Sequence, residues 1–255
     1  MTTSELLSTY LKRLRLPAMA KAHERLAEEA KTNKASYQDY LCCLLEQEVQ
    51  ARDESTTKER ITQAKFPSPK TLDSFNFDEI PNLNKKLVLK LFGGQYLHQG
   101  ENIVFIGGQG TGKTHLSIAL GMQACSEGKR VKFFTVADLT HQLIEARDEK
   151  QLLRFQQQLA RCDLLIMDEL GRIEGTQDGA NLLFQVLGSR YERSATIITT
   201  NLDFADWSSV FMTKNLTAAV LDRLNHRCHL VEVNGESYRF KESMRNKKAV
   251  SKKVN

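Results

Sequence analysis

The glycine-rich segment 107–114 carries the clearest chemical signal in the sequence. It reads GGQGTGKT and fits the phosphate-binding pattern G-x-x-x-x-G-K-[ST] at every fixed position. Glycines let the backbone curl so that successive N–H groups point inward, and the start of a following helix adds partial positive charge. Lys113 can then reach the β- and γ-phosphates, and the Thr114 hydroxyl can bind Mg²⁺. The segment therefore predicts binding of a nucleoside triphosphate, ATP, together with Mg²⁺.

The residues on either side of this loop support the prediction. An apolar run at 103–106 precedes it, and a helix-like stretch at 115–120 follows it. The loop therefore joins a strand to a helix, which is the context that such a motif requires. The expected nucleotide contacts are Gly107, Gly108, Gln109, Gly110, Thr111, Gly112, Lys113, Thr114 and His115.

Two neighbouring acids end another apolar run, at 164–167. Carboxylate oxygen suits a hard cation, so Asp168 is expected to contact the nucleotide site by sharing Mg²⁺ coordination with Thr114. Glu169 can accept a proton from the water that attacks the γ-phosphate. Because side chains alternate along a strand, the two acids begin on opposite faces and take different roles.

Asn201 follows a third apolar run, at 195–200. If this strand lies between the strands that carry the glycine-rich loop and the acid pair, Asn201 points at the γ-phosphate and can orient the water. The alternative is an asparagine that simply starts a turn, which is a common use of this residue. The pattern alone favours the turn.

The elements that must position these residues alternate along the second part of the chain. Helical patterns separate the apolar runs, which is typical of an α/β fold in which helices flank a parallel sheet. Ligands in such sheets bind at the carboxyl ends of the strands, where the loop and the acid pair lie. The expected strands are residues 103–106, 131–136, 163–167, 195–200 and 229–233.

The first part of the chain, residues 4–63, has helical periodicity throughout. Three of the four prolines fall at positions 67, 69 and 81, and such a cluster is typical of a boundary. The helical part is too small to bury much surface by itself, so we expect it to pack on something else. We divide the chain into a helical assembly or partner domain (1–65), a linker (66–82), an ATPase domain (83–240) and a basic tail (241–255).

Composition indicates an ordinary globular protein. The 255 residues are 41% hydrophobic and 26% charged, and no run is long and apolar enough for a membrane span. The start of the chain lacks a signal-peptide pattern, and the five cysteines lie in apolar stretches, so we expect a cytoplasmic location. The net charge is +5, and segment 234–255 holds seven Lys or Arg against two Glu. That segment can contact DNA phosphates or can equally be a solvated end.

Taken together, these motifs resemble the AAA+ ATPases of the DnaC/IstB branch, and within it the IstB-like transposition helper ATPases. The resemblance spans nearly the whole chain apart from the tail. One departure is Gly108-Gln109, where relatives often carry proline, and it leaves the phosphate-binding positions intact. The matching stretches are residues 14–19, 111–116, 165–171, 199–202 with Trp207 and Phe211, 219–224 and 235–239.

The resemblance implies a catalytic role for Arg223 that spacing does not show. In this branch the arginine of the Asp-Arg-Leu element reaches from one subunit to the γ-phosphate held by its neighbour. Guanidinium suits that role because it stays charged and forks onto phosphate oxygens. The local alternative is a surface pair between Asp222 and Arg223. Arg239 is a candidate second arginine near the nucleotide.

The resemblance also implies an ATP-dependent regulator that oligomerises as a ring or helix on target DNA and stimulates a transposase. Binding to double-stranded DNA is expected to be independent of sequence, through helices between the second and third strands. The candidates there are Arg147, Lys150 and Arg154. The window 138–161 holds equal numbers of acidic and basic residues, so charge alone favours a solvated helix face.

Two other functions stay open at this stage. A replicative helicase loader of the DnaC type would use the same motor on a different client. A non-hydrolysing scaffold with a vestigial nucleotide site is less consistent with the intact set of Lys113, Thr114, Asp168, Glu169 and Asn201.

Overall fold

The computed structural model describes residues 2–171 and 177–238. The chain forms two compact units, Met1–Glu59 and Arg60–Asn255. No helix in the described ranges has the length and apolar character that crossing a membrane would require. The predicted basic tail, 241–255, and Arg239 lie outside the described residues.

The first unit is built from α1 (Thr3–Arg13), α2 (Pro17–Thr32) and the larger part of α3 (Tyr37–Ala64). Its core is small and includes Leu11, Met19 and Leu44. Pro17 occupies the first turn of α2, where its missing N–H costs nothing. The predicted helical character of this region is confirmed, with breaks around residues 14–16 and 33–36.

The buried carboxylate of Glu48 joins α3 to α2 within this unit. It accepts hydrogen bonds from the backbone N–H groups of Ala18 (2.9 Å) and Met19 (3.1 Å), at the start of α2. Arg52 pairs with the same side chain at 3.0 Å. Burial alone would raise the pKa of Glu48, but the bonds from Met19, Arg52 and Ala18 outweigh it and hold the pKa below its usual value. The carboxylate therefore acts as a charged cap for α2.

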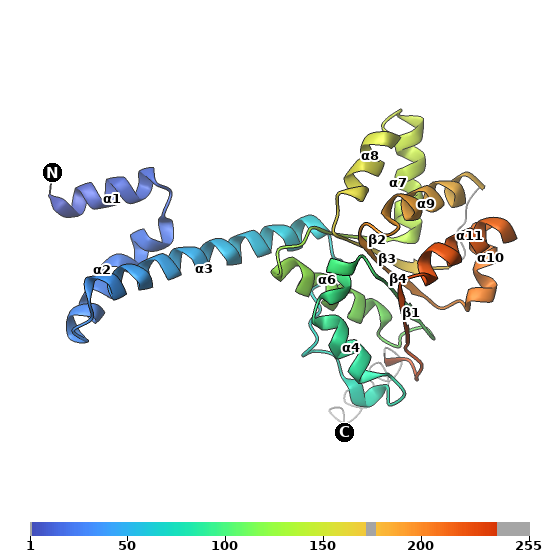
Figure 1. Cartoon of the computed structure of the whole chain (residues 1–255), viewed down its shortest axis with the longest axis horizontal. Helices are drawn as coiled ribbons and strands as arrows, with labels where there is room; N and C mark the ends of the chain where they lie inside the picture. The colour runs from blue at the N-terminus through green and yellow to red at the C-terminus, as the bar shows by residue number, and fades with distance from the viewer. Residues whose placement is uncertain (1, 172–176, 239–255) are drawn as a thin grey trace, which may run out of the picture. The chain divides into compact units, whose positions relative to one another are not determined.

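The second unit contains a parallel sheet of five strands in the order β2-β3-β4-β1-β5 (Figure 1). This confirms the predicted fold class, and each predicted strand is present with small shifts at its ends. The strands are β1 (Asn102–Ile106), β2 (Val131–Thr135), β3 (Leu164–Leu170), β4 (Ala195–Thr200) and β5 (Cys228–Glu232).

Helices cover both faces of this sheet (Figure 1). Alternation of side chains places Ile103 and Phe105 on one face with α6 (Lys113–Ser126), and Val104 on the other face with α7 (Val136–Asp148) and α9 (Gln177–Arg190). The helices that follow the strands are α6 (Lys113–Ser126), α7 (Val136–Asp148), α8 (Leu152–Ala160), α9 (Gln177–Arg190), α10 (Ser208–Phe211) and α11 (Lys214–Asn225), with a 3-10 turn at Phe204–Trp207.

The segment predicted as a linker, 66–82, contributes to the core of the second unit. Phe66 and Phe75 pack against the cluster that contains α6, and Ile80 is 5% exposed. A 3-10 turn (Phe77–Glu79) and the helices α4 (Lys85–Phe92) and α5 (Gln95–Gln99) follow before β1. We therefore describe 66–82 as part of the second unit, whereas the functional division of the chain into domains stays a prediction.

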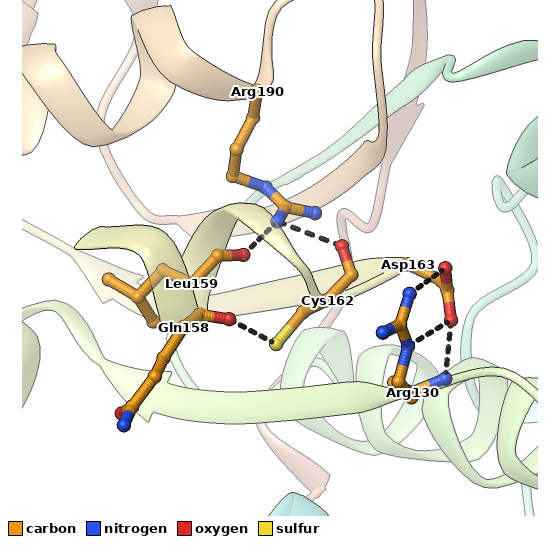
Figure 2. Close-up of polar contacts among 6 residues, drawn as sticks. All are labelled: Arg130, Gln158, Leu159, Cys162, Asp163 and Arg190. Carbon is orange, nitrogen blue, oxygen red and sulfur yellow. Dashed lines mark hydrogen bonds and ion pairs between the residues drawn. The ribbon is translucent and has the colours of Figure 1, made fainter. Parts of the chain in front are cut away.

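The buried guanidinium of Arg190 joins the end of α9 to α8 and to the segment between α8 and β3 (Figure 2). Arg190, at the end of α9, is 1% exposed and donates to the carbonyls of Leu159 (2.6 Å) and Cys162 (3.0 Å). It also donates to Ala195 O at 2.6 Å and to Thr196 Oγ1 at 3.1 Å on β4. Burial lowers the pKa of Arg190 to about 10, so the side chain is still charged at neutral pH. Its donors thus connect α8, β4 and the turn before β3.

Candidate nucleotide-binding site

The glycine-rich loop links the end of β1 to the first residue of α6, as predicted. Gly112, the residue before the helix, has φ +100°, a conformation that side chains with a Cβ rarely adopt. A Cβ there would also lie 2.7 Å from Phe75 Cε2. Glycine at this position therefore lets the loop turn tightly against the segment that precedes the sheet.

Lys113 and Thr114 form the first turn of α6, where backbone N–H groups and the helix dipole favour an anion. The Lys113 ammonium donates to the carbonyls of Gly107 (2.8 Å) and Gly108 (2.6 Å). The lysine therefore lies along the loop itself, at the place where the β- and γ-phosphates of a nucleotide would lie.

Thr114, Asp168 and Thr199 form a hydrogen-bonded group between α6, β3 and β4. The Thr114 hydroxyl donates to Asp168 at 2.9 and 3.0 Å from its two oxygens. The Thr199 hydroxyl donates to Asp168 Oδ1 at 2.6 Å. Burial raises the pKa of Asp168, while the two hydroxyl donors oppose that shift by stabilising the carboxylate.

This arrangement fits Mg²⁺. A threonine hydroxyl and a carboxylate are hard oxygen ligands, and they lie next to each other at the phosphate-binding helix terminus. The described residues contain no cluster of three His, Cys, Asp or Glu side chains that could hold a metal alone. A cation here would therefore take its other ligands from the nucleotide and water, as is usual for Mg²⁺.

Glu169 differs in conformation from an ordinary strand residue. Its φ is +60°, and the pairing of β3 with β4 shifts register between Met167 and Leu170. The Glu169 N–H donates to the Thr199 hydroxyl at 2.9 Å. Whereas simple strand alternation was expected to separate the two acids, this bulge turns Glu169 into the cavity while Asp168 stays buried.

Asn201 follows β4, and β4 lies between β1 and β3, which is the strand order that its predicted role requires. It lines the same cavity as Glu169 and Lys113. The expected strand order is thus confirmed, and the role of Asn201 in orienting water at the γ-phosphate stays a prediction.

A cavity of about 1070 Å³ opens beside the loop, and the segment 67–80 forms one of its walls. Pro67, Pro69, Phe75 and Ile80 supply apolar surface there, which suits the flat face of a base. Because the prolines read as a boundary, sequence reasoning missed this wall. The aromatic and apolar residues that follow them were the available signal.

His115 contacts this wall. Its Nε2 lies 2.9 Å from Thr71 O and 3.3 Å from Ser74 Oγ, and its ring meets Phe75 edge-on at 5.3 Å. Burial lowers the pKa of His115, which favours the neutral ring. The structure therefore places His115 where it supports the wall, in addition to its place in the predicted contact set.

Comparison with known proteins decides the family. The family of IstB-like ATP binding proteins matches residues 9–246. The chain belongs to this family. It is 38% identical over 236 residues to a protein of insertion sequence IS21 from Pseudomonas aeruginosa that is described as ATP-binding, covering 92% of this chain and 89% of that one. A corresponding protein of IS5376 from Geobacillus stearothermophilus is 36% identical, covering 93% and 95%.

Solved structures agree on the fold. AMPPCP-bound DnaA from Aquifex aeolicus superposes with a TM-score of 0.57 at 24% identity, over 69% of this chain and 54% of that chain. The IstB-like chain therefore has the P-loop AAA+ fold, with a sheet and loop arranged to bind ATP.

Arg223 of the IstB-like chain is absent from the residues that line the cavity. Its guanidinium carbon is 4.2 Å from the centroid of the Phe184 ring on α9. Within the described residues no ion pair joins it to Asp222, so the local surface pair is not observed. This placement leaves a role in a neighbouring subunit's site as a prediction.

The three DNA candidates of the IstB-like chain differ in their surroundings. Arg147 pairs with Asp178 at 2.8 Å and with Asp148 at 3.1 Å. Lys150 and Arg154 are exposed, near the turn between α7 and α8. Two acids therefore already neutralise Arg147, which makes Lys150 and Arg154 the better candidates for phosphate contacts.

Proposed function

We propose that the chain hydrolyses ATP and couples hydrolysis to its assembly on DNA. The observation that carries this proposal is the Thr114–Asp168–Thr199 group with Glu169 held beside it. A site that only bound ATP would need the loop but would not need a carboxylate turned into the cavity at the cost of a left-handed backbone.

Each residue of the site has its own role in the proposed reaction. Lys113 binds the β- and γ-phosphate oxygens. Thr114 and Asp168 would hold Mg²⁺, which would supply charge neutralisation at those oxygens. Asn201 orients the water, and Glu169 takes its proton as the water oxygen attacks the γ-phosphorus and ADP leaves. Exposure of Glu169 to the cavity gives it access to that water.

Arg223 completes the site from the adjoining subunit in this proposal. Its absence from the residues that line the cavity of its own chain, and its position on α11, support a role in trans. Arginines that stabilise the transferred phosphoryl group contribute about 10³–10⁵ in rate. ATP would thus bind at the junction of two subunits and hold a ring or helical oligomer together.

The biological role that we propose is recruitment and stimulation of a transposase at double-stranded target DNA. The relatives that are 36–38% identical are proteins of insertion sequences, and this supports a role in transposition. Exposed Lys150 and Arg154 supply a surface for DNA phosphates without base recognition.

A steady-state ATPase assay with and without duplex DNA tests the enzymatic part. Glu169→Gln is expected to bind ATP and to accumulate DNA-bound oligomers with turnover reduced at least a hundredfold, because the proton acceptor is lost. Glu232→Gln, an exposed acid at the end of β5, is the matched control and should retain turnover. Normal turnover in Glu169→Gln would refute its role as the base.

The assembly part has its own test. Lys113→Ala is expected to lose ATP binding and DNA-dependent oligomers together, whereas Lys90→Ala on the exposed face of α4 should retain both. Particle images with ATP and duplex DNA would show the oligomers directly. Normal assembly of Lys113→Ala on DNA would contradict the coupling of ATP binding to assembly. If a pull-down with the protein captured a replicative helicase in place of a transposase, the role would be that of a helicase loader.

A further inference from the structure

The guanidinium of Arg223 lies over an aromatic ring. Phe184, on the neighbouring helix α9, is half-buried, and its ring centroid is 4.2 Å from the guanidinium carbon. A cation over an aromatic face is held by the quadrupole of the ring, and arginine is the commonest partner. Such a contact does not use the N–H donors of the guanidinium in hydrogen bonds.

Gly188 lies four residues after Phe184 on α9, so the two positions share one face of the helix. A Cβ built on Gly188 would lie 2.9 Å from Arg223 Nη1, closer than real Cβ contacts allow. The end of the Arg223 side chain thus occupies the space where a side chain at position 188 would lie. Phe184 and Gly188 together form a cradle, one by an aromatic face and the other by the lack of a Cβ.

No hydrogen bond joins the guanidinium of Arg223 to another residue in the ranges 2–171 and 177–238. Arginine loses substantial rotamer freedom when it is fixed, so an unheld arginine would reach a distant phosphate at a high entropic cost. An arginine already held by its cradle has less freedom left to lose. The N–H donors that make no hydrogen bond within the described ranges are the ones that would bind the phosphate oxygens.

We propose that Phe184 and Gly188 are positioning residues that hold Arg223 ready for the γ-phosphate bound by the adjoining subunit. The inference rests on the proposed trans role of Arg223 and extends it to two residues on a different helix. It makes the cradle a determinant of turnover and leaves ATP binding in the subunit's own cavity unaffected, since neither residue lines that cavity.

Gly188→Ala separates positioning from structure. Alanine favours a helix over glycine, and the atom it displaces is the far end of a flexible side chain. The melting temperature is therefore expected to stay the same or rise by a few degrees, while kcat for DNA-stimulated ATP hydrolysis falls about three- to tenfold. Affinity for an ATP analogue should stay the same. A lower kcat at an undiminished melting temperature and unchanged analogue affinity therefore indicates lost positioning of Arg223 and not local unfolding of α9.

Phe184→Leu gives an independent test of the aromatic face, because leucine keeps apolar volume and loses the quadrupole. It should lower kcat by a similar factor. Phe204→Leu is the matched control, since Phe204 packs in the same core cluster against Trp207 with no cation on its ring. That variant should retain kcat.

Mixed oligomers make failure of this inference distinguishable from failure of the proposed function. Lys113→Ala subunits carry an intact Arg223, and Arg223→Ala subunits carry an intact loop. Lys113→Ala is not expected to assemble alone, but ATP bound by the loop of an Arg223→Ala subunit can join the two kinds of subunit. Mixing them should therefore restore turnover if the arginine acts in trans. The double variant Lys113→Ala/Gly188→Ala, used as the arginine donor in place of Lys113→Ala, should restore turnover less well. If Arg223→Ala is inactive but Gly188→Ala and Phe184→Leu turn over normally, the cradle is refuted and the trans role stands. If Arg223→Ala itself turns over normally, both are refuted.

Discussion

Thr199 offers the sharpest test of the candidate site, because one hydroxyl serves both acids. It donates to Asp168 Oδ1 at 2.6 Å and accepts the Glu169 N–H at 2.9 Å, and the residue is 1% exposed. Thr199→Val removes the hydroxyl and retains the shape. The carboxylate then loses a donor, and a backbone N–H in a left-handed conformation loses its acceptor.

The magnitude follows from these two losses. A hydrogen bond to a charged group contributes about 1.5–3 kcal/mol, and a buried N–H left unpaired costs about 1–3 kcal/mol. If only the lost hydrogen bond to Asp168 affects the metal site, kcat at fixed Mg²⁺ should fall by roughly ten- to a hundredfold, since each 1.36 kcal/mol is a factor of ten in rate. The Mg²⁺ concentration for half-maximal rate should rise as well, because Asp168 is less well oriented.

The assay is steady-state ATP hydrolysis with Mg²⁺ as the varied component, beside thermal unfolding. Thr199→Ser is the matched control, because it restores the hydroxyl and loses only a methyl group. Serine should recover most of kcat, even though its melting temperature falls somewhat. A Thr199→Val protein with normal kcat and normal Mg²⁺ dependence would show that this hydroxyl does not organise the acids.

Three further predictions concern the scaffold. Gly112→Ala should weaken ATP binding, measured by calorimetry, and lower the free energy of unfolding by about 1–3 kcal/mol, because φ of Gly112 is +100° and the new Cβ would clash with Phe75. Gly108→Ala is the control: its Cβ would meet only Thr111, at 3.7 Å, so the melting temperature should stay unchanged. Arg190→Met should destabilise the protein by roughly 3–5 kcal/mol in urea unfolding, since several buried carbonyls lose their donor, and a change below 1 kcal/mol would contradict this. The pKa of Glu48 in the folded protein is held below its ordinary value of 4.5. The stabilisation that the Glu48 carboxylate contributes is therefore complete above pH 4.5 and is lost as the pH falls through the lower folded-state pKa. Glu48→Gln should lower the melting temperature by about 2–6 °C at pH 7, and the difference from the unchanged protein should shrink toward pH 3.

Much of the site could be predicted because its parts are local in sequence. Gly112, Lys113 and Thr114 lie within one loop and one helical turn, and their geometry follows from glycine conformations and the helix terminus. Apolar runs with helical stretches between them were enough to predict the parallel sheet, since period and length distinguish strands from helices.

The rest depends on contacts between residues far apart in the chain. The hydroxyl of Thr199 matters only because β4 lies beside β3, and no local pattern distinguishes it from any other strand threonine. The prolines before Phe75 indicate, taken locally, a boundary between elements, so the wall of the cavity could not be predicted from them. Packing of Phe75 against α6 makes the same segment part of the pocket.

Neighbouring residues were sufficient to predict the glycine-rich loop, the two acids and the alternation of strands and helices, because each of these features is local in the chain. Two features arise only from packing: the bulge that turns Glu169 into the cavity, and the position of Arg223 on Phe184. Strand register and helix packing bring side chains that are distant in sequence within a few ångströms, so their positions depend on the whole packed unit.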